Sequence, residues 1–366
     1  MRRLINQMRH HTYFFTAILI LIFNSCTENG VDDGNGHQTE PTVENLSFNE
    51  IISPTPDSIK TLESLKKEGE LFMMTYYGNY RSRLEELNNQ IIANGIGSII
   101  PPHNNNHECS IFSAMGNPQL PIFGRNLDNS GVQRGVMVGL YNPPNGYSSI
   151  AVTNMINMGF TRNDDPTQLS IEERLILLNA VLFATDGINE NGVAIALASV
   201  DTEPLIRDES KKLVNLSYIM REVLDHAGNL DEAISIIQNH DVFDQNTSTI
   251  SHHLLIADAS GNSAVTEYRE GEWKVMHNNR AWQIATNDLI YGKTEEWKRN
   301  QCERYRAADD YLNNTRGNVS WYEGINVLEL MAEGTTQWSS IYDLVNRRVY
   351  ISLYTQYNII QSIQLH

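Results

Sequence analysis

The apolar run at residues 71–77 predicts a buried strand in the first part of the chain. This run, Leu-Phe-Met-Met-Thr-Tyr-Tyr, is apolar or aromatic almost throughout, and its length suits a strand. A Gly-Asn pair follows and predicts a turn, after which residues 80–92 are expected to form a helix. Residues 94–106 contain glycines, prolines and several asparagines, which predict a loop. A structured segment and an exposed loop therefore precede Cys109.

From Cys109 onward, short apolar runs bounded by turn residues alternate with segments of helical spacing. The runs predict strands over residues 109–115, 120–125, 193–200, 254–256, 264–268 and 273–276, and a C-terminal hairpin of residues 338–344 and 349–354. Helical spacing predicts helices over residues 170–182, 213–224, 233–237 and 294–312, the first opened by a capping box of Ser170 and Glu173. We therefore expect an α+β fold in which two antiparallel sheets are covered by helices.

The first 26 residues have the order of segments found in a secretory signal. Arginines precede an apolar run over residues 13–23, which is too short to span a membrane. Cys26 follows closely, and this arrangement resembles a bacterial lipoprotein signal, in which the cysteine is lipidated and becomes the mature N-terminus. An ordinary signal peptide with an incidental cysteine is the alternative. We expect an exported cell-envelope lipoprotein, at the outer membrane or the periplasmic face, that meets the membrane only through a lipid at Cys26.

Composition indicates a globular protein and argues against a nucleic-acid partner. The chain has 366 residues, of which 41% are hydrophobic, enough for one large core or two smaller ones. Its net charge of -17 is unsuited to a polyphosphate, which needs a basic surface. Residues 27–42 are polar and acidic without periodic apolar positions, so we expect a flexible tether there.

After Cys26, the chain contains two more cysteines, Cys109 and Cys302. In an oxidising compartment they could form a disulfide, which would silence both thiols. The chain would then be a non-catalytic, lipid-anchored binding protein. The surroundings of Cys109 favour a different interpretation, in which this residue is a nucleophile.

A cysteine at a chain terminus carries two of the groups that amide cleavage requires. Cleavage needs a nucleophile, a base that can also protonate the leaving amine, and donors for the oxyanion. The α-amino group has an ordinary pKa of about 7.7 to 8.0, so it can take the thiol proton and return it to the leaving nitrogen. Cys109 could act in this way once the chain is cut between Glu108 and Cys109.

Several short motifs occur in an order and spacing that are hard to obtain by chance. Cys-Ser-Ile-Phe at 109–112 is followed after one hairpin by Phe-Gly-Arg-Asn-Leu-Asp at 123–128. Further motifs lie at 186–194, 285–287 and 338–344. Together they resemble the choloylglycine hydrolase and penicillin acyltransferase group of N-terminal-nucleophile hydrolases. The resemblance implies an αββα sandwich over residues 109–366, preceded by a pro-segment over residues 43–108.

The resemblance also implies roles for individual residues. Cys109 would be the nucleophile, and Asp128 would hydrogen-bond its α-amino group. Arg125 would stabilise the thiolate, because a nearby cation lowers the pKa of a cysteine. Asn287 would donate its side-chain amide to the oxyanion. Arg304 is the expected counterpart of a late active-site arginine, with Arg306 as the alternative.

Each of these assignments has a structural alternative. Arg125 and Asp128 could form a surface ion pair on a turn, and Asn287 could simply end a strand. Arg304 and Arg306 could both lie on the solvated face of a helix. The Asp186-Gly187 and Asn191-Gly192 pairs are interpreted as turns. Histidines at 103, 107, 252 and 253 could suggest a metal, but the first two lie in the loop expected to be cut, and we predict neither metal nor cofactor.

Two positions depart from the family pattern. Bile-salt hydrolases place an asparagine where this sequence has Ser199, so the second oxyanion donor is expected to be a hydroxyl, a backbone N–H or another group. Glu108 precedes the nucleophile, whereas the acyltransferase branch usually has glycine there. The prediction is hydrolysis of a linear amide in a small molecule through a thioester, with acyl transfer to another amine as the alternative. A homo-oligomer is left open.

Overall fold

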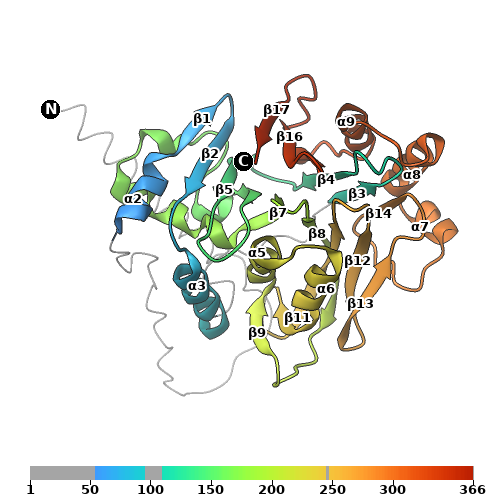
Figure 1. Ribbon diagram of the computed structural model, residues 1–366, viewed down its shortest axis with the longest axis horizontal. Coiled ribbons are helices and arrows are strands. Elements are labelled where there is room, and N and C mark those ends of the chain that lie inside the picture. The colour runs from blue at the N-terminus through green and yellow to red at the C-terminus, as the bar shows by residue number, and fades with distance from the viewer. Residues whose placement is uncertain (1–53, 95–108, 245–246, 366) are drawn as a thin grey trace, which may run out of the picture. The chain divides into compact units, whose positions relative to one another are not determined.

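Two stacked β-sheets form the centre of the structure (Figure 1). The computed structural model describes residues 54–94, 109–244 and 247–365. The larger sheet has the strand order β1 (Lys66–Glu68), β2 (Leu71–Tyr76), β5 (Val136–Tyr141), β6 (Ser149–Asn154), β7 (Ala184–Asn189), β8 (Ala194–Pro204), β11 (Thr249–Ala257), β12 (Ser263–Arg269) and β13 (Glu272–His277). The smaller sheet has the order β14 (Trp282–Ala285), β3 (Ser110–Ala114), β4 (Ile122–Asp128), β15 (Thr336–Asp343), β16 (Arg348–Leu353) and β17 (Gln361–Gln364). Neighbouring strands are antiparallel in both sheets, except for β2 and β5.

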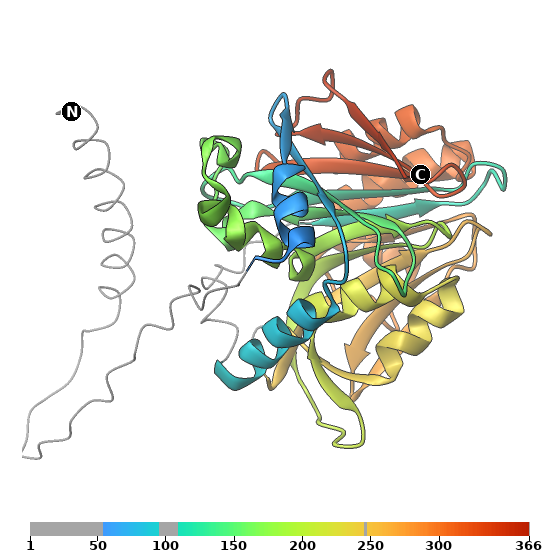
Figure 2. The ribbon, with the colours of Figure 1, turned by 60° about the vertical axis from the view of Figure 1, so that its left-hand side comes forward.

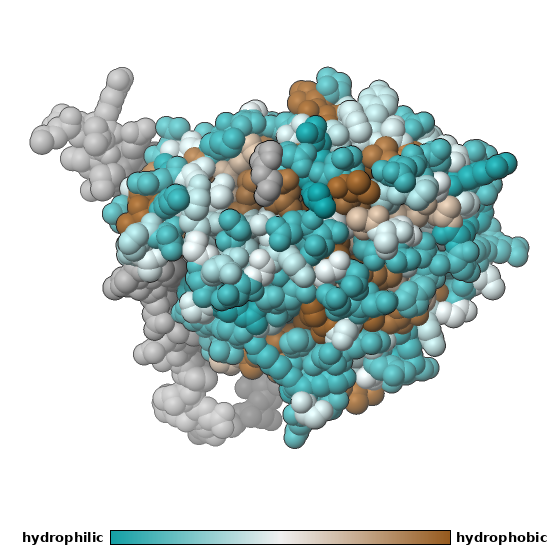
Figure 3. All heavy atoms as spheres, viewed as in Figure 1, coloured by the Kyte–Doolittle hydropathy of each residue, from teal (hydrophilic) through white to brown (hydrophobic). Residues whose placement is uncertain are grey.

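Helices cover the outer face of each sheet, which confirms the expected αββα sandwich (Figure 2). The larger sheet is covered by α2 (Pro56–Glu63), α3 (Arg81–Asn94), α5 (Leu216–His226) and α6 (Leu230–Gln238), and the smaller sheet by α8 (Glu303–Thr315) and α9 (Trp321–Leu330). A third apolar cluster fills the space between the sheets. Apolar side chains are thus gathered between layers, and the face shown in Figure 3 is mostly hydrophilic.

Strand β8 shows how the sequence produces these layers. Side chains alternate along a strand, so its alanines at 194, 196 and 198 face the smaller sheet. Ile195 and Leu197 face the helices instead. Small side chains on the inner face let the two sheets approach each other. Even-numbered residues in this part of β8 therefore place their side chains between the sheets, and odd-numbered residues place theirs against the helices.

The helices predicted over residues 170–182 and 213–224 differ from the structure in their kind or their start. Ser170 and Glu173 form the expected capping box, but α4 (Ile171–Arg174) continues as a 3-10 helix, η4 (Leu175–Leu182). Residues 177–182 are all buried, so the leucine spacing there marks no single apolar face. Helix α5 begins three residues later than predicted, because Leu213 lies in β9 (Lys212–Asn215) and Asn215 caps the helix. Strand β9 pairs in parallel with β10 (His240–Phe243) as a separate two-stranded sheet.

The helix predicted over residues 294–312 is interrupted at Cys302. It forms α7 (Glu295–Gln301) and α8, because Cys302 has extended backbone angles and its Sγ accepts a hydrogen bond from the Tyr305 N–H at 3.5 Å. Cys302 is therefore the N-cap of α8. This break starts a new helix directly before Arg304.

The segment before Cys109 is part of the sandwich. Strand β2 pairs in parallel with β5, and its Leu71 and Met73 lie in the cluster between the sheets. The Tyr76 hydroxyl donates to the Leu177 carbonyl at 2.7 Å, and the Tyr80 hydroxyl donates to Asp225 at 2.7 Å. These buried contacts join the segment to elements that follow Cys109.

We expect this segment to stay bound if the chain is cut before Cys109. Its apolar side chains would otherwise return to water, at about 25 cal/mol per Å² of apolar surface. Size-exclusion chromatography without denaturant should give one peak, and a denaturing gel of that peak should show two fragments. A peak that contains only the fragment beginning at Cys109 would contradict this expectation.

Candidate active site

Cys109 lies between the two sheets, directly before β3. Its side chain is 3% exposed and packs in the inter-sheet cluster with Ile111. Phe112 and Ala114 point the other way, toward α8 and α9. The alternation of the Cys-Ser-Ile-Phe-Ser-Ala segment thus places the thiol in the interior of the sandwich.

The Arg125 guanidinium on β4 faces the Cys109 thiol. Its Nη2 lies 3.7 Å from Cys109 Sγ, and the side chain is fully buried. Ile111 pairs with Arg125 in the antiparallel β3–β4 ladder, and this register brings Arg125 close to Cys109. Burial raises the pKa of the Cys109 thiol, while the charge of Arg125 lowers it. Burial has the larger effect, so the uncut chain favours the neutral thiol.

Asp186 on β7 holds the other side of Arg125, a role that the sequence interpretation missed. Its Oδ1 lies 3.6 Å from Arg125 Nη1, and both side chains are completely buried. The carboxylate also accepts hydrogen bonds from Ser340 at 2.7 Å, Trp338 and Tyr342. The interpretation of Asp186-Gly187 as a turn is therefore wrong, because both residues lie within a strand. Arg125 and Asp128 also form no surface ion pair, since both are buried.

Asp128 ends β4 beside Cys109 and is fully buried. It accepts a hydrogen bond from the Thr336 hydroxyl and lies 3.5 Å from Arg304 Nη1. Burial nevertheless raises the pKa of Asp128 to about 7, and these two partners only partly offset it. In the uncut chain this carboxyl therefore changes its charge near neutral pH.

The raised pKa of Asp128 predicts a pH-dependent stability. An aspartate in an unfolded chain has a pKa of about 3.9, so the folded carboxyl keeps its proton to a higher pH. The protonated Asp128 carboxyl therefore contributes its full stability below about pH 3.9, and this stability is lost as the pH rises through about 7. In a Cys109→Ala background, we expect Asp128→Asn to reduce the loss of unfolding free energy between pH 5 and pH 8 by on the order of 2 kcal/mol. Urea denaturation at both pH values measures it, and parallel pH profiles of the two proteins would contradict it.

Arg304, in the first turn of α8, joins three parts of the site. Its Nη1 donates to the Cys109 carbonyl at 3.2 Å, and its Nη2 donates to Asn287 Oδ1 at 2.9 Å. Arg306 instead pairs with Glu303 at the surface. The structure thus places Arg304 in the site, and the solvated helix face is the correct description for Arg306 alone.

Asn287 follows the end of β14 and its side-chain amide is held on both sides. Oδ1 accepts from Arg304, which fixes the orientation of the amide, and Nδ2 donates to the Ser199 carbonyl at 2.8 Å. An amide nitrogen carries two N–H groups, so a second one remains for a ligand. Asn287 therefore does more than end a strand.

The Ser199 hydroxyl lies on the opposite face of the larger sheet from Cys109. Ser199 is on the same face of β8 as Ile195 and Leu197, which face the helices. Its Oγ lies 3.1 Å from His252 Nε2. The hydroxyl therefore does not face the thiol. The Ser199 carbonyl points at Asn287, and the N–H of a strand residue points to the same edge as its carbonyl.

Cys109 and Cys302 are both free thiols, so the alternative of a disulfide between them is wrong. Within the described residues, no group of three or more His, Cys, Asp or Glu side chains is arranged to hold a metal ion. His103 and His107 lie outside the described residues, as do the predicted signal peptide and tether. Among the described helices, none is long and apolar enough to cross a membrane.

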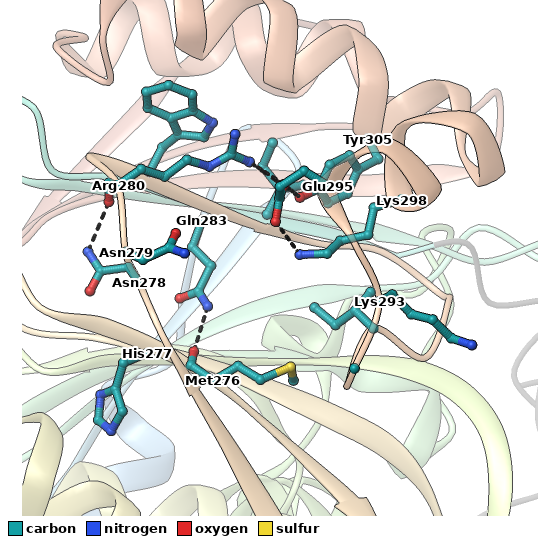
Figure 4. A pocket seen from close by; sticks show the side chains of 14 residues that line it. Met276, His277, Asn278, Asn279, Arg280, Gln283, Lys293, Glu295, Lys298 and Tyr305 are labelled. Atoms are coloured by element: carbon teal, nitrogen blue, oxygen red, sulfur yellow. Dashed lines mark hydrogen bonds and ion pairs between the residues drawn. The ribbon is translucent and has the colours of Figure 1, made fainter.

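A separate pocket, shown in Figure 4, lies between β13, β14 and α7 and is lined by neither Cys109 nor Asn287. Arg280 and Lys298 converge there on Glu295, at 2.6 and 2.5 Å. Arg280 also pairs with Asp309 at 2.8 Å, so both of these cations have a carboxylate partner. The groups expected for catalysis meet instead at Cys109.

Comparisons with known proteins agree with the fold. A penicillin V acylase of Pectobacterium atrosepticum is 30% identical over 116 residues. The match covers 29% of this chain and 31% of that protein. The solved penicillin V acylase from Agrobacterium tumefaciens has a TM-score of 0.51 and 18% identity over 70% of this chain and 86% of its own. A mutant conjugated bile acid hydrolase from Clostridium perfringens has a TM-score of 0.51 and 15% identity over 70% of this chain and 92% of its own. These two structures share the N-terminal-nucleophile fold with this chain.

The family model of the linear amide C-N hydrolases matches residues 109–330, which are more than half of the chain. The matched region begins at Cys109 and contains Arg125, Asp128, Asn287 and Arg304. The chain therefore belongs to the linear amide C-N hydrolases of the choloylglycine hydrolase family.

Proposed function

We propose that this protein hydrolyses a linear amide with Cys109 as nucleophile, after cleavage between Glu108 and Cys109. The observation that carries the proposal is the convergence of Arg125, Asp128 and Arg304 on the buried residue Cys109, with Asn287 held by Arg304. Cleavage would add a free α-amino group beside the thiol. Ionised Asp128 would then accept hydrogen bonds from that amine.

The reaction follows from these groups. The α-amino group takes the thiol proton, and Sγ forms a bond to the amide carbonyl carbon. Asn287 Nδ2 donates to the resulting oxyanion, and the Ser199 N–H, at the same strand edge as its carbonyl, is the second donor. The protonated amine then passes its proton to the leaving nitrogen, and the carbon–nitrogen bond breaks to give a thioester. The same amine removes a proton from water, which attacks the thioester carbonyl carbon. The carbon–sulfur bond then breaks, the acid is released, and the amine returns the proton to the Cys109 thiolate.

The substrate proposed is a small molecule with an amide between an acyl group and an amine. The named relatives are a penicillin V acylase and a conjugated bile acid hydrolase, so these two acyl classes are the first probes. Mass spectrometry of the purified protein should show a fragment that begins at Cys109, and this fragment should release amine from one of the amides. An intact chain that hydrolyses none of them would refute the proposal.

We also propose that the protein is exported and anchored by a lipid at Cys26. The proposal rests on the order of arginines, apolar run and cysteine in the first 26 residues. Labelled palmitate should be incorporated by cells that express the native chain and not by cells that express Cys26→Ser. Equal labelling of both proteins would refute the anchor.

A further inference from the structure

Two buried ionisable side chains of the larger sheet, His253 and Glu267, lie outside the chemistry described above. His253 on β11 is directly opposite Glu267 on the neighbouring strand β12. Their side chains are 0% and 1% exposed, and His253 Nδ1 lies 3.4 Å from Glu267 Oε2. Burying two charged groups is costly unless both are well hydrogen-bonded, so the partners of this pair are informative.

Their further partners lie on the loop that carries Asn287. His253 Nε2 is 2.7 Å from the Thr286 carbonyl oxygen, immediately before Asn287. Glu267 accepts hydrogen bonds from the backbone N–H groups of Ile290 at 2.8 Å and Tyr291 at 3.0 Å, which follow Asn287 in the chain. The loop leaves β14 of the smaller sheet, whereas the pair belongs to the larger sheet. The pair thus fixes the loop on both sides of Asn287 from across the sandwich.

The hydrogen bonds also show which atoms of the pair donate to the loop and which accept from it. A carbonyl oxygen can only accept, so His253 Nε2 carries a proton. Burial acts to raise the pKa of Glu267, but the hydrogen bond and charge of His253 and the two backbone N–H groups lower it overall. His253 Nε2 therefore donates to the loop, and the Glu267 carboxylate accepts from it.

We propose that His253 and Glu267 are positioning residues that set the distance of Asn287 from Cys109. The inference rests on the proposed function, in which Asn287 donates to the oxyanion. A donor acts on developing charge only if it is already at the right place, and a displacement of about 1 Å can cost about 100-fold in rate. Three attachments fix the loop to the larger sheet: Thr286 to His253, Asn287 to Ser199, and residues 290–291 to Glu267.

The test compares His253→Ala with His253→Gln in protein already cut at Cys109. We expect His253→Ala to lower kcat by about 10 to 100-fold with KM changed by less than about threefold, because the lost contact affects transition-state charge. Gln can still donate to the Thr286 carbonyl, so His253→Gln should recover most of the loss. His240→Ala is the matched control, since His240 also contacts a backbone carbonyl, that of Ile236 at 2.8 Å, away from the loop.

A double-mutant cycle separates positioning from general damage. In an Asn287→Ala background, His253→Ala should cause almost no further loss of kcat, because the residue through which it acts is already gone. A full additional loss would overturn the proposal, and so would wild-type kcat in His253→Ala alone.

Hydrogen exchange tests, without any assay of activity, whether His253 and Glu267 hold the loop of residues 286–291 in place; this pair of contacts is called the clamp. Amides of residues 288–291 should exchange faster in His253→Ala and in Glu267→Gln than in the wild type or His240→Ala. Unchanged exchange would overturn the clamp even if the enzyme were inactive. A wild-type protein that is cut at Cys109 but hydrolyses no amide would instead refute the proposed function, so the two failures are distinguishable. Glu267→Gln also keeps the test open if His253→Ala does not fold.

Discussion

Replacing Cys109 with alanine is expected to abolish amide hydrolysis and to leave the chain uncut after Glu108. Turnover should fall by on the order of 10,000-fold or more, because the thiol forms the covalent bond to the substrate and no neighbouring group can replace it. Arg125 Nη2 lies 3.7 Å from the Cys109 Sγ that this substitution removes. Intact mass and amine release, measured on the same preparation, give both results.

Cys109→Ser separates the two roles of this residue. A serine hydroxyl can attack the preceding peptide bond but is a much weaker nucleophile at neutral pH, so slow cutting with little turnover is expected. Cys302→Ala is the matched control, since Cys302 is the other free thiol of the described residues and lies at the start of α8. A Cys109→Ala chain that is cut as efficiently as the wild type would show that an external protease makes the cut. A Cys109→Ala protein with wild-type turnover would refute the nucleophile.

The family resemblance implied that Cys109, Arg125 and Asp128 share one site, and a single hairpin brings these three residues together. Strands β3 and β4 are close in the chain, and their register pairs Ile111 with Arg125. Only residues 115–121 separate the two strands, so the spacing of the motif carries information about their register. The αββα architecture was implied by the family resemblance, and the pattern of strands and helices by itself predicted two antiparallel sheets covered by helices.

Asp186 could not be assigned, because its environment is built by distant residues. An Asp-Gly pair is typical of turns, and only the pairing of β7 within the larger sheet shows that it is buried. One signal was present in the sequence: Trp338, Ser340 and Tyr342 are three hydrogen-bond donors on one face of a strand. Donors spaced by two in a buried strand require an acceptor opposite them.

Ser199 shows the limit of a motif comparison in another way. The sequence alignment of this position with an asparagine says nothing about which face its side chain takes. In the structure the Ser199 hydroxyl contacts His252 on the helix side of the larger sheet. Its backbone carbonyl accepts a hydrogen bond from Asn287. A role in the site thus remains for the main chain of Ser199, and not for its hydroxyl.

Asn287→Ala is expected to lower kcat by roughly 100 to 1,000-fold, the usual cost of removing one preorganised oxyanion donor. KM should change much less, because the donor acts on charge that develops in the transition state. Arg304 fixes the amide so that Nδ2 is the group turned toward Ser199 and the site. Steady-state kinetics on protein already cut at Cys109 measures the effect, since a processing defect would otherwise imitate a catalytic one.

Asn287→Asp tests the donor without changing the shape of the side chain. The carboxylate can still pair with Arg304, but it offers no N–H to the oxyanion and adds a negative charge beside it. We therefore expect a loss at least as large as for Asn287→Ala. Asn262→Ala is the matched control, because this exposed asparagine bonds only within its own turn, to Ser260 at 2.8 Å, and to no residue of the site. If Asn287→Asp retains wild-type kcat on an amide that the wild type hydrolyses, Asn287 is a structural residue of the loop and the oxyanion must be bound elsewhere.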